Sequence, residues 1–153
     1  MERLAHHARL EWDGSTGDGY RVYPRAHTAT APPASASLEL SADPHFRGDA
    51  SLLNPEQLIV LAASSCQMLS FLALAARKHL TVVRYTDEAT GYLSEDLRKA
   101  SIELIELNPV IHVAEGTDEA FVRELVEQGH EECYIANSLR STITITPTIV
   151  VAT

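Results

Sequence analysis

The chain has 153 residues, 45% of them apolar and 22% charged, a composition that can bury the core of one globular domain. Its 21 acidic and 12 basic residues leave a formal net charge of −9. This acidic balance disfavours nucleic acids and anionic membranes as partners, because both attract basic proteins. Two cysteines are too few for a disulfide-rich secreted scaffold, so they are two buried thiols, one bridge or a redox pair. The N-terminus has no apolar run typical of a signal peptide, and we expect a cytoplasmic protein.

Short strand patterns and turn signals fill the N-terminal part of the chain. Strands are predicted at residues 8–12, 20–23 and 37–40, which indicates a β-hairpin followed by a third strand. The turn-rich segment 13–19 and the residues around Pro32-Pro33 separate them. Residues 41–53 follow as a polar loop without a clear period.

A long apolar helix is predicted from Asn54 to about His79. Asn54 is a good N-cap, Pro55 suits the first helical position, and Glu56 places a negative charge at the positive end of the helix dipole. Residues 58–76 carry no charge and as a helix would nearly span a bilayer core, but the polar side chains in their middle disfavour a membrane span. We expect instead a helix buried on all sides by a sheet or by a partner subunit.

The second half of the chain alternates strands with one amphipathic helix. Strands are predicted at residues 81–85, 91–94 and 100–113, the last interrupted at Asn108-Pro109, and at 142–151, interrupted at Pro147. A helix from about 117 to 137 carries an apolar stripe, which continues to Cys133. The resulting order β-β-β-α-β-β-β-α-β indicates an α+β fold.

The two cysteines are the strongest candidates for chemistry. Cys66 lies in the middle of the apolar helix among polar neighbours that a purely lipophilic core does not need, and Cys133 is predicted to face inward. The simpler interpretation is that both are small hydrophobic side chains. A buried thiolate needs a nearby cation, which an arginine of the N-terminal strands or loop can provide. A carboxylate such as Glu56 can hold that guanidinium in a bidentate pair.

Other kinds of site find little support in the sequence. The seven histidines form no HxxxH or HExxH pair, and neither cysteine lies in a CxxC motif, so no metal is expected. No GxGxxG or GxxxxGK motif indicates a nucleotide cofactor. A cysteine hydrolase with a histidine base stays open.

Several segments form a specific pattern in consistent order along the chain. They are Asn54-Pro55-Glu56-Gln57-Leu58, Ala63-Ser64-Ser65-Cys66, Met68-Leu69 and, far downstream, Cys133-Tyr134-Ile135-Ala136-Asn137-Ser138. This pattern resembles the OsmC/Ohr family of osmotically inducible and organic-hydroperoxide-resistance proteins. The segments 23–27, 42–49 and 85–87 resemble its OsmC-like branch. The resemblance implies a single OsmC-like domain over residues 1–153, in which two chains interlock around the central helices as a homodimer.

The resemblance also implies a function and roles for individual residues. Cys66 would be the peroxidatic thiolate that reduces organic hydroperoxides, with hydrogen peroxide as a further candidate, and Cys133 would resolve its sulfenic acid as a disulfide. An external thiol or dithiol would then reduce the disulfide. Glu56 matches the carboxylate that orients the active-site arginine, for which Arg25 is the best match and Arg21 the second.

Two departures from the family pattern leave the substrate preference open. Gln67 follows the cysteine where this branch often has a histidine, and the segment 46–49 replaces the glycine-rich loop of the Ohr subgroup. The alternative to an enzyme is a non-catalytic OsmC-like dimer that binds a small apolar ligand between its subunits.

Overall fold

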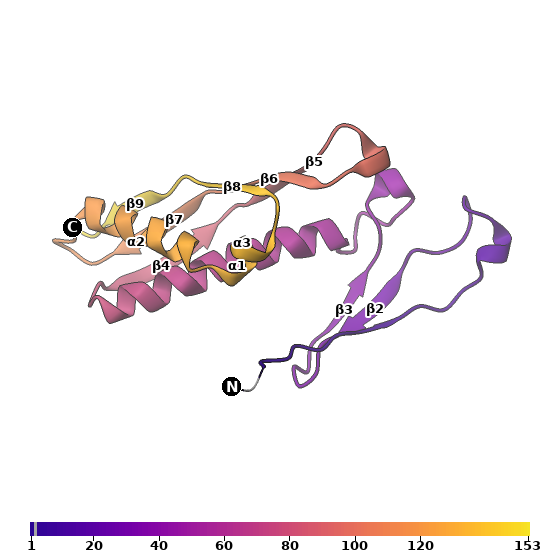
Figure 1. Ribbon diagram of the computed structural model, residues 1–153, viewed down its shortest axis with the longest axis horizontal. Coiled ribbons are helices and arrows are strands. Elements are labelled where there is room, and N and C mark those ends of the chain that lie inside the picture. Colours follow the sequence, from indigo (N-terminus) through magenta and orange to yellow (C-terminus); the bar gives the residue numbers. More distant parts are fainter. Residues whose placement is uncertain (2) are drawn as a thin grey trace. The chain divides into compact units, whose positions relative to one another are not determined.

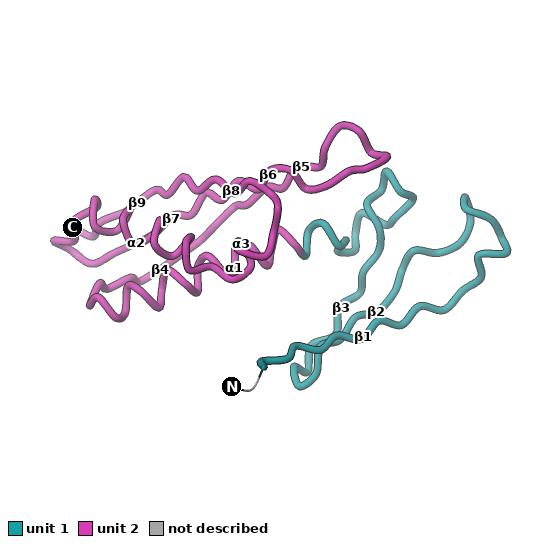
Figure 2. The backbone as a smooth tube through the Cα atoms, in the orientation of Figure 1, with its two compact units in different colours: residues 1–58 teal, residues 59–153 magenta. Residues whose placement is uncertain are grey.

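The computed structural model describes Met1 and residues 3–153, which form two compact units, residues 1–58 and residues 59–153 (Figure 2). The strands are β1 (Arg9–Glu11), β2 (His27–Thr30), β3 (Ser37–Leu40), β4 (Val82–Asp87), β5 (Thr90–Leu93), β6 (Ile102–Leu107), β7 (Pro109–Val113), β8 (Thr142–Ile145) and β9 (Thr148–Val151). The helices are α1 (Pro55–Arg77), α2 (Glu119–Glu131) and α3 (Tyr134–Ser138) (Figure 1). The predicted α+β class is confirmed, whereas a single domain over residues 1–153 stays a prediction.

The first unit contains an antiparallel sheet in the order β1-β2-β3. The strand predicted at residues 20–23 is wrong, because this segment is a turn in which the N–H groups of Val22 and Tyr23 both donate to the Gly19 carbonyl, at 3.0 and 3.3 Å. Gly19 has a φ of 92°, a left-handed conformation that glycine adopts without strain and that starts the turn. The second strand begins only at His27.

Helix α1 has well-defined signals at both ends. At the N-terminus, the Gln57 N–H donates to the Asn54 side chain and the Asn54 N–H donates to the Gln57 side chain, both at 2.9 Å, which is a reciprocal capping pair. At the other end His79 has a left-handed φ of 59°. Its N–H donates to the Ala76 carbonyl, and the Leu80 N–H donates to the Ala75 carbonyl. This Schellman arrangement ends the helix at Arg77, slightly before the predicted end.

The second unit contains two three-stranded sheets, in the orders β4-β7-β9 and β5-β6-β8. In each sheet the first pair of strands is antiparallel and the second pair is parallel. The single strands predicted at residues 100–113 and 142–151 are each two strands, one per sheet. The predicted count of three strands between the long helices is therefore wrong, since β4, β5, β6 and β7 all lie there.

The strand breaks lie next to one another. The Asp87 carboxylate, at the end of β4, accepts a hydrogen bond from the Asn108 N–H at 2.7 Å, between β6 and β7. The Thr146 N–H, between β8 and β9, donates to the Leu107 carbonyl at 2.9 Å. The other Asp87 oxygen accepts the Ser64 hydroxyl hydrogen bond from α1. The breaks thus form one seam that is tied to the turn of α1 that precedes Cys66.

One face of α1 supplies the core of the second unit. Phe71 is fully buried and packs with apolar side chains of α2 and β7, namely Ile111, Val113, Val122, Leu125 and Val126. Leu61 and Leu69 on the same helix are 54% and 60% exposed. The length and composition of α1 would suffice to cross a membrane, but this packing is that of a core helix. The predicted burial on all sides is not reached within one chain.

The helix predicted at residues 117–137 is divided into α2 and α3. Its apolar stripe is confirmed, because Val122, Leu125, Val126 and Gly129 are all buried. The prediction that Cys133 continues this stripe inside the same helix is wrong, because α2 ends at Glu131. Cys133 is the N-cap of α3, with an extended ψ of 112°, and its side chain accepts a hydrogen bond from the Ala136 N–H. The thiol nevertheless points inward, with only 1% of the residue exposed.

Candidate active site

The structure brings Cys66 and Cys133 together within the second unit. Cys66 is half-buried in the middle of α1, Cys133 is buried at the start of α3, and both are free thiols. Hydrogen bonding between the two thiols affects the pKa of each. Two residues that are far apart in sequence therefore form one thiol pair, because the chain between them folds into a sheet and a helix that pack on α1.

The surroundings of Cys66 favour its thiolate. Burial is the largest single influence and raises the pKa of this thiol, but hydrogen bonds from Cys133, from the N–H groups of Ile135 and Tyr134 and from Ser70 together outweigh it. The net result is a pKa below the ordinary value of a thiol. Lowering the pKa raises the fraction of the nucleophilic thiolate at neutral pH.

Cys133 shows the opposite behaviour. Burial, hydrogen bonding to Cys66 and the nearby charge of that thiolate raise the pKa of Cys133. The Ala136 N–H, 3.4 Å from the sulfur, acts in the other direction but does not reverse the shift. Of the two thiols, Cys66 is therefore the one that loses its proton at the lower pH.

Within the second unit, the donors to the Cys66 thiolate are a thiol, a hydroxyl and two main-chain N–H groups. The arginine that we expect beside this thiolate belongs to the first unit, and its role stays a prediction. Ser70 could have been found, because it lies four residues after Cys66 and so on the same side of the helix. The N–H groups of Tyr134 and Ile135 carry no sequence signal, since every residue except proline has one.

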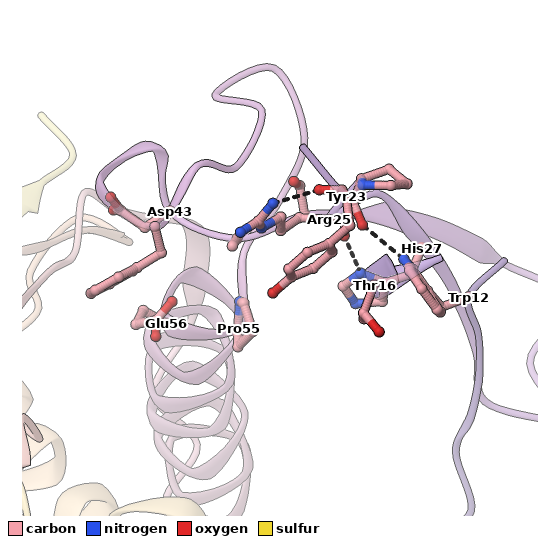
Figure 3. Close-up of a pocket in the computed structure, with 12 residues that line it drawn as sticks. Trp12, Thr16, Tyr23, Arg25, His27, Asp43, Pro55 and Glu56 are labelled. Atoms are coloured by element: carbon pink, nitrogen blue, oxygen red, sulfur yellow. Dashed lines mark hydrogen bonds between the residues drawn. The ribbon is translucent and has the colours of Figure 1, made fainter. Parts of the chain in front are cut away.

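Arg25 and Glu56 line one cavity in the first unit (Figure 3). The cavity has a volume of about 530 Å³ and is lined by Trp12, Thr16, Tyr23, Pro24, Arg25, His27, Ser41, Ala42, Asp43, Phe46, Pro55 and Glu56. Arg21, the second candidate for the active-site arginine, does not line it. The cavity combines aromatic walls with both acidic and basic side chains.

The guanidinium of Arg25 is held by aromatic rings and main-chain carbonyls. It lies 3.6 Å from the centre of the Tyr23 ring and 4.9 Å from that of Tyr20, within cation–π range of both. Its two terminal nitrogens donate hydrogen bonds to the carbonyls of the same two tyrosines, one of which is drawn in Figure 3. The tyrosines of the wrongly predicted strand thus serve to position this arginine.

The acidic side chains of the cavity are not paired with Arg25. Among the described residues no salt bridge joins Arg25 to Glu56. Asp43 instead accepts hydrogen bonds from the N–H and the ring of His45, which lower the pKa of its carboxyl group. The bidentate Arg25–Glu56 pair therefore stays a prediction. Within the described part of the chain, no group of three or more His, Cys, Asp or Glu residues is arranged to hold a metal ion.

The fold and the thiol pair define an α+β protein with a two-cysteine site, and comparisons with known proteins place it in a family. The family model described as OsmC-like protein matches residues 48–148, so the chain belongs to the OsmC-like protein family. An OsmC-like protein of unknown function from Vibrio cholerae is 28% identical, with a TM-score of 0.85 over 95% of this chain and 99% of the other.

More distant solved structures share the fold. An organic hydroperoxide resistance protein OsmC from Legionella pneumophila is 16% identical, with a TM-score of 0.66 over 98% of this chain and 99% of the other. An organic hydroperoxide resistance protein from Elizabethkingia anophelis is 18% identical, with a TM-score of 0.70 over 99% of this chain and 100% of the other. A search of curated proteins finds no match.

Proposed function

We propose that the protein is a thiol-dependent peroxidase that reduces organic hydroperoxides. The observation that supports this most directly is the opposite shift of two adjacent thiols, with the pKa of Cys66 lowered and that of Cys133 raised. A peroxidatic cysteine must be a thiolate, whereas the resolving cysteine can keep its proton until the sulfenic acid has formed. Family membership supports the same reaction class.

The proposed cycle has three balanced steps. The Cys66 thiolate attacks the O–O bond of the hydroperoxide and becomes a sulfenic acid, while the departing alkoxide takes a proton and leaves as the alcohol. The Cys133 sulfur then attacks the Cys66 sulfur, and its proton leaves with the hydroxide as water. An external thiol or dithiol reduces the resulting disulfide and is itself oxidised.

Arg25 and Glu56 complete the proposed site. A guanidinium can stabilise the oxygen that becomes negative as the O–O bond breaks. We propose that Arg25 has this role and that Glu56, on the same cavity, orients it. We also propose a homodimer, because α1 exposes Leu61 and Leu69 in the isolated chain and a second copy would cover them.

The cycle can be tested by intact mass and peroxide consumption. One equivalent of cumene hydroperoxide should remove two hydrogens from the wild-type protein, and both Cys66→Ser and Cys133→Ser should block this loss. With a dithiol present, the wild type should consume peroxide continuously and Cys66→Ser should not. A wild type that consumes no hydroperoxide with any thiol reductant would refute the proposal.

The aromatic cavity of the first unit favours a second candidate function, the binding of a small apolar ligand without catalysis. The two candidates differ in the reactivity of Cys66. If iodoacetamide labels Cys66 at pH 6 no faster than an ordinary thiol, and calorimetry detects an apolar ligand whose binding Trp12→Ala abolishes, the binding function replaces the enzymatic one.

A further inference from the structure

The side chain of Gln67, next to Cys66, has a role that packing does not explain. It is 1% exposed, and its amide nitrogen donates a hydrogen bond to the Val126 carbonyl of α2 at 3.0 Å. Its amide oxygen is buried and has no partner among the described residues. Burial of an unpaired carbonyl is unfavourable, and a leucine or methionine would fill similar space without it. The directional contact with Val126 is therefore the property that distinguishes glutamine at this position.

The contact joins α1 and α2 at a place where their backbones lie close together. A Cβ atom at Gly129 would lie 3.1 Å from the backbone nitrogen of Phe71 and 3.5 Å from the amide nitrogen of Gln67. No side chain separates the backbones of α1 and α2 there. The Gln67 hydrogen bond fixes the helices against sliding along this contact, which apolar packing alone resists less because it is not directional.

Each end of this hydrogen bond is close in the chain to one thiol. Gln67 directly follows Cys66 on α1. On α2, hydrogen bonds from Glu132 to the Gln128 carbonyl and from Cys133 to the His130 carbonyl, at 3.1 and 3.2 Å, carry ordered backbone from the end of the helix to the second thiol. A shift of α2 along α1 would therefore move one sulfur relative to the other.

We propose that Gln67 is a positioning residue for disulfide formation, which it promotes by fixing α2, and with it Cys133, against the helix that carries Cys66. This inference rests on the proposed function for its role in a catalytic cycle. The step concerned is the attack of the Cys133 sulfur on the Cys66 sulfenic acid, in which the S–S bond forms, the S–O bond breaks and water leaves. Gln67 touches neither sulfur and acts only on their alignment.

The test replaces Gln67 by methionine, which is similar in size but donates no hydrogen bond. In a dithiothreitol redox buffer, Gln67→Met should lower the equilibrium constant for forming the Cys66–Cys133 disulfide by about tenfold, because alignment governs effective molarity. Gln67→His, which restores an N–H donor, should recover most of this loss. In a Cys133→Ser background, Gln67→Met should leave the rate of Cys66 oxidation by cumene hydroperoxide unchanged.

Two controls separate positioning from stability. Gln128→Met removes an amide of α2 that donates a hydrogen bond to Glu132 at the surface, and it should leave the disulfide equilibrium unchanged. Val113→Ala opens the core at β7, and it should lower the unfolding midpoint without the same change in that equilibrium. If Gln67→Met does not fold, Gly129→Ala replaces it as the test. This variant keeps the Gln67 amide but displaces α2 from Phe71, so it should also lower the equilibrium constant for forming the disulfide.

The inference is overturned if Gln67→Met forms the disulfide with the same equilibrium constant as the wild type. It is also overturned if Val113→Ala lowers this constant as much as Gln67→Met does. The redox buffer contains no peroxide, so this result is independent of peroxidase activity. If the wild type reduces no hydroperoxide but Gln67→Met still weakens the disulfide, the proposed function fails and the positioning role stands.

Discussion

The thiol pair of the second unit and the arginine of the first unit are built in different ways. Cys133 is buried and Cys66 is half-buried, and main-chain N–H groups of α3 are among the donors to the two sulfurs. Arg25 lies on a turn and is held by tyrosine rings, one of which belongs to Tyr20, a residue that is 61% exposed. The thiol pair therefore depends on the stability of the core. The Arg25 site depends instead on side chains that can be exchanged without unfolding the protein.

The largest difference should appear in stability. Phe71→Ala removes a fully buried ring from the core and should lower the free energy of unfolding by about 3–5 kcal/mol. Tyr20→Ala removes an exposed ring and should lower it by less than about 1 kcal/mol. Urea unfolding at a fixed protein concentration measures both. Equal losses would mean that the two regions are not built differently.

The next effect concerns the role that we propose for Arg25 in the first unit. Arg25→Ala should lower the second-order rate constant for cumene hydroperoxide by about 100-fold, because it removes a donor to the developing negative oxygen. Arg25→Lys should recover only part of this loss, since an ammonium cannot make the planar bidentate contacts of a guanidinium. Arg21→Ala is the matched control and should have no effect. If Arg21→Ala is the inactive variant, our assignment of the arginine is wrong.

A smaller loss of stability is expected at the seam between the strands. Asp87→Ala removes the acceptor for both Ser64 and Asn108 and should lower the free energy of unfolding by about 1–3 kcal/mol. Glu11→Ala removes an exposed carboxylate whose side-chain partner is Arg9, and it should change stability by less than about 0.5 kcal/mol. Thermal unfolding of the two variants tests whether the seam is a structural link.

The smallest effect is a change in the pKa of Cys66, measured by the pH dependence of iodoacetamide labelling. Both Cys133→Ala and Ser70→Ala remove a donor to the thiolate, so both should raise this pKa, Cys133→Ala by more. A higher pKa means less thiolate at pH 7 and slower labelling there, with equal rates at high pH, where the thiol is fully ionised. Ser65→Ala, an exposed change on the same helix, should have no effect. A lower pKa in either donor variant would contradict our account of the site.

The fold class, the limits of α1 and the choice of Cys66 and Cys133 as candidate residues could be predicted from the sequence, because their signals are local. Asn54 and Pro55 mark the start of α1 through hydrogen bonding and backbone geometry that need no tertiary structure. The buried stripe of α2 likewise follows from helical spacing alone.

The features that were missed depend on contacts between distant segments. Residues 20–23 include strand-forming side chains, but Tyr20 and Tyr23 contact Arg25 and the backbone forms a turn from Gly19. Cys133 fits a helical stripe, yet it caps a new helix because its sulfur accepts the Ala136 N–H. The main-chain donors to Cys66 could not be predicted, because they become a site only when α3 packs beside α1.

The seam between the strands has a consequence for how the length of this chain can change in evolution. Side chains of a strand alternate between the two faces of the sheet. A residue inserted inside a strand would therefore move every following side chain of that strand to the opposite face. Between Asp87 and Thr90, however, an extra residue would leave β4 paired with β7 and β5 paired with β6. The same holds near Asn108 and Pro147, where β6 ends before β7 and β8 before β9. Insertions and deletions among relatives should therefore gather at these positions, while the paired strands keep a constant length.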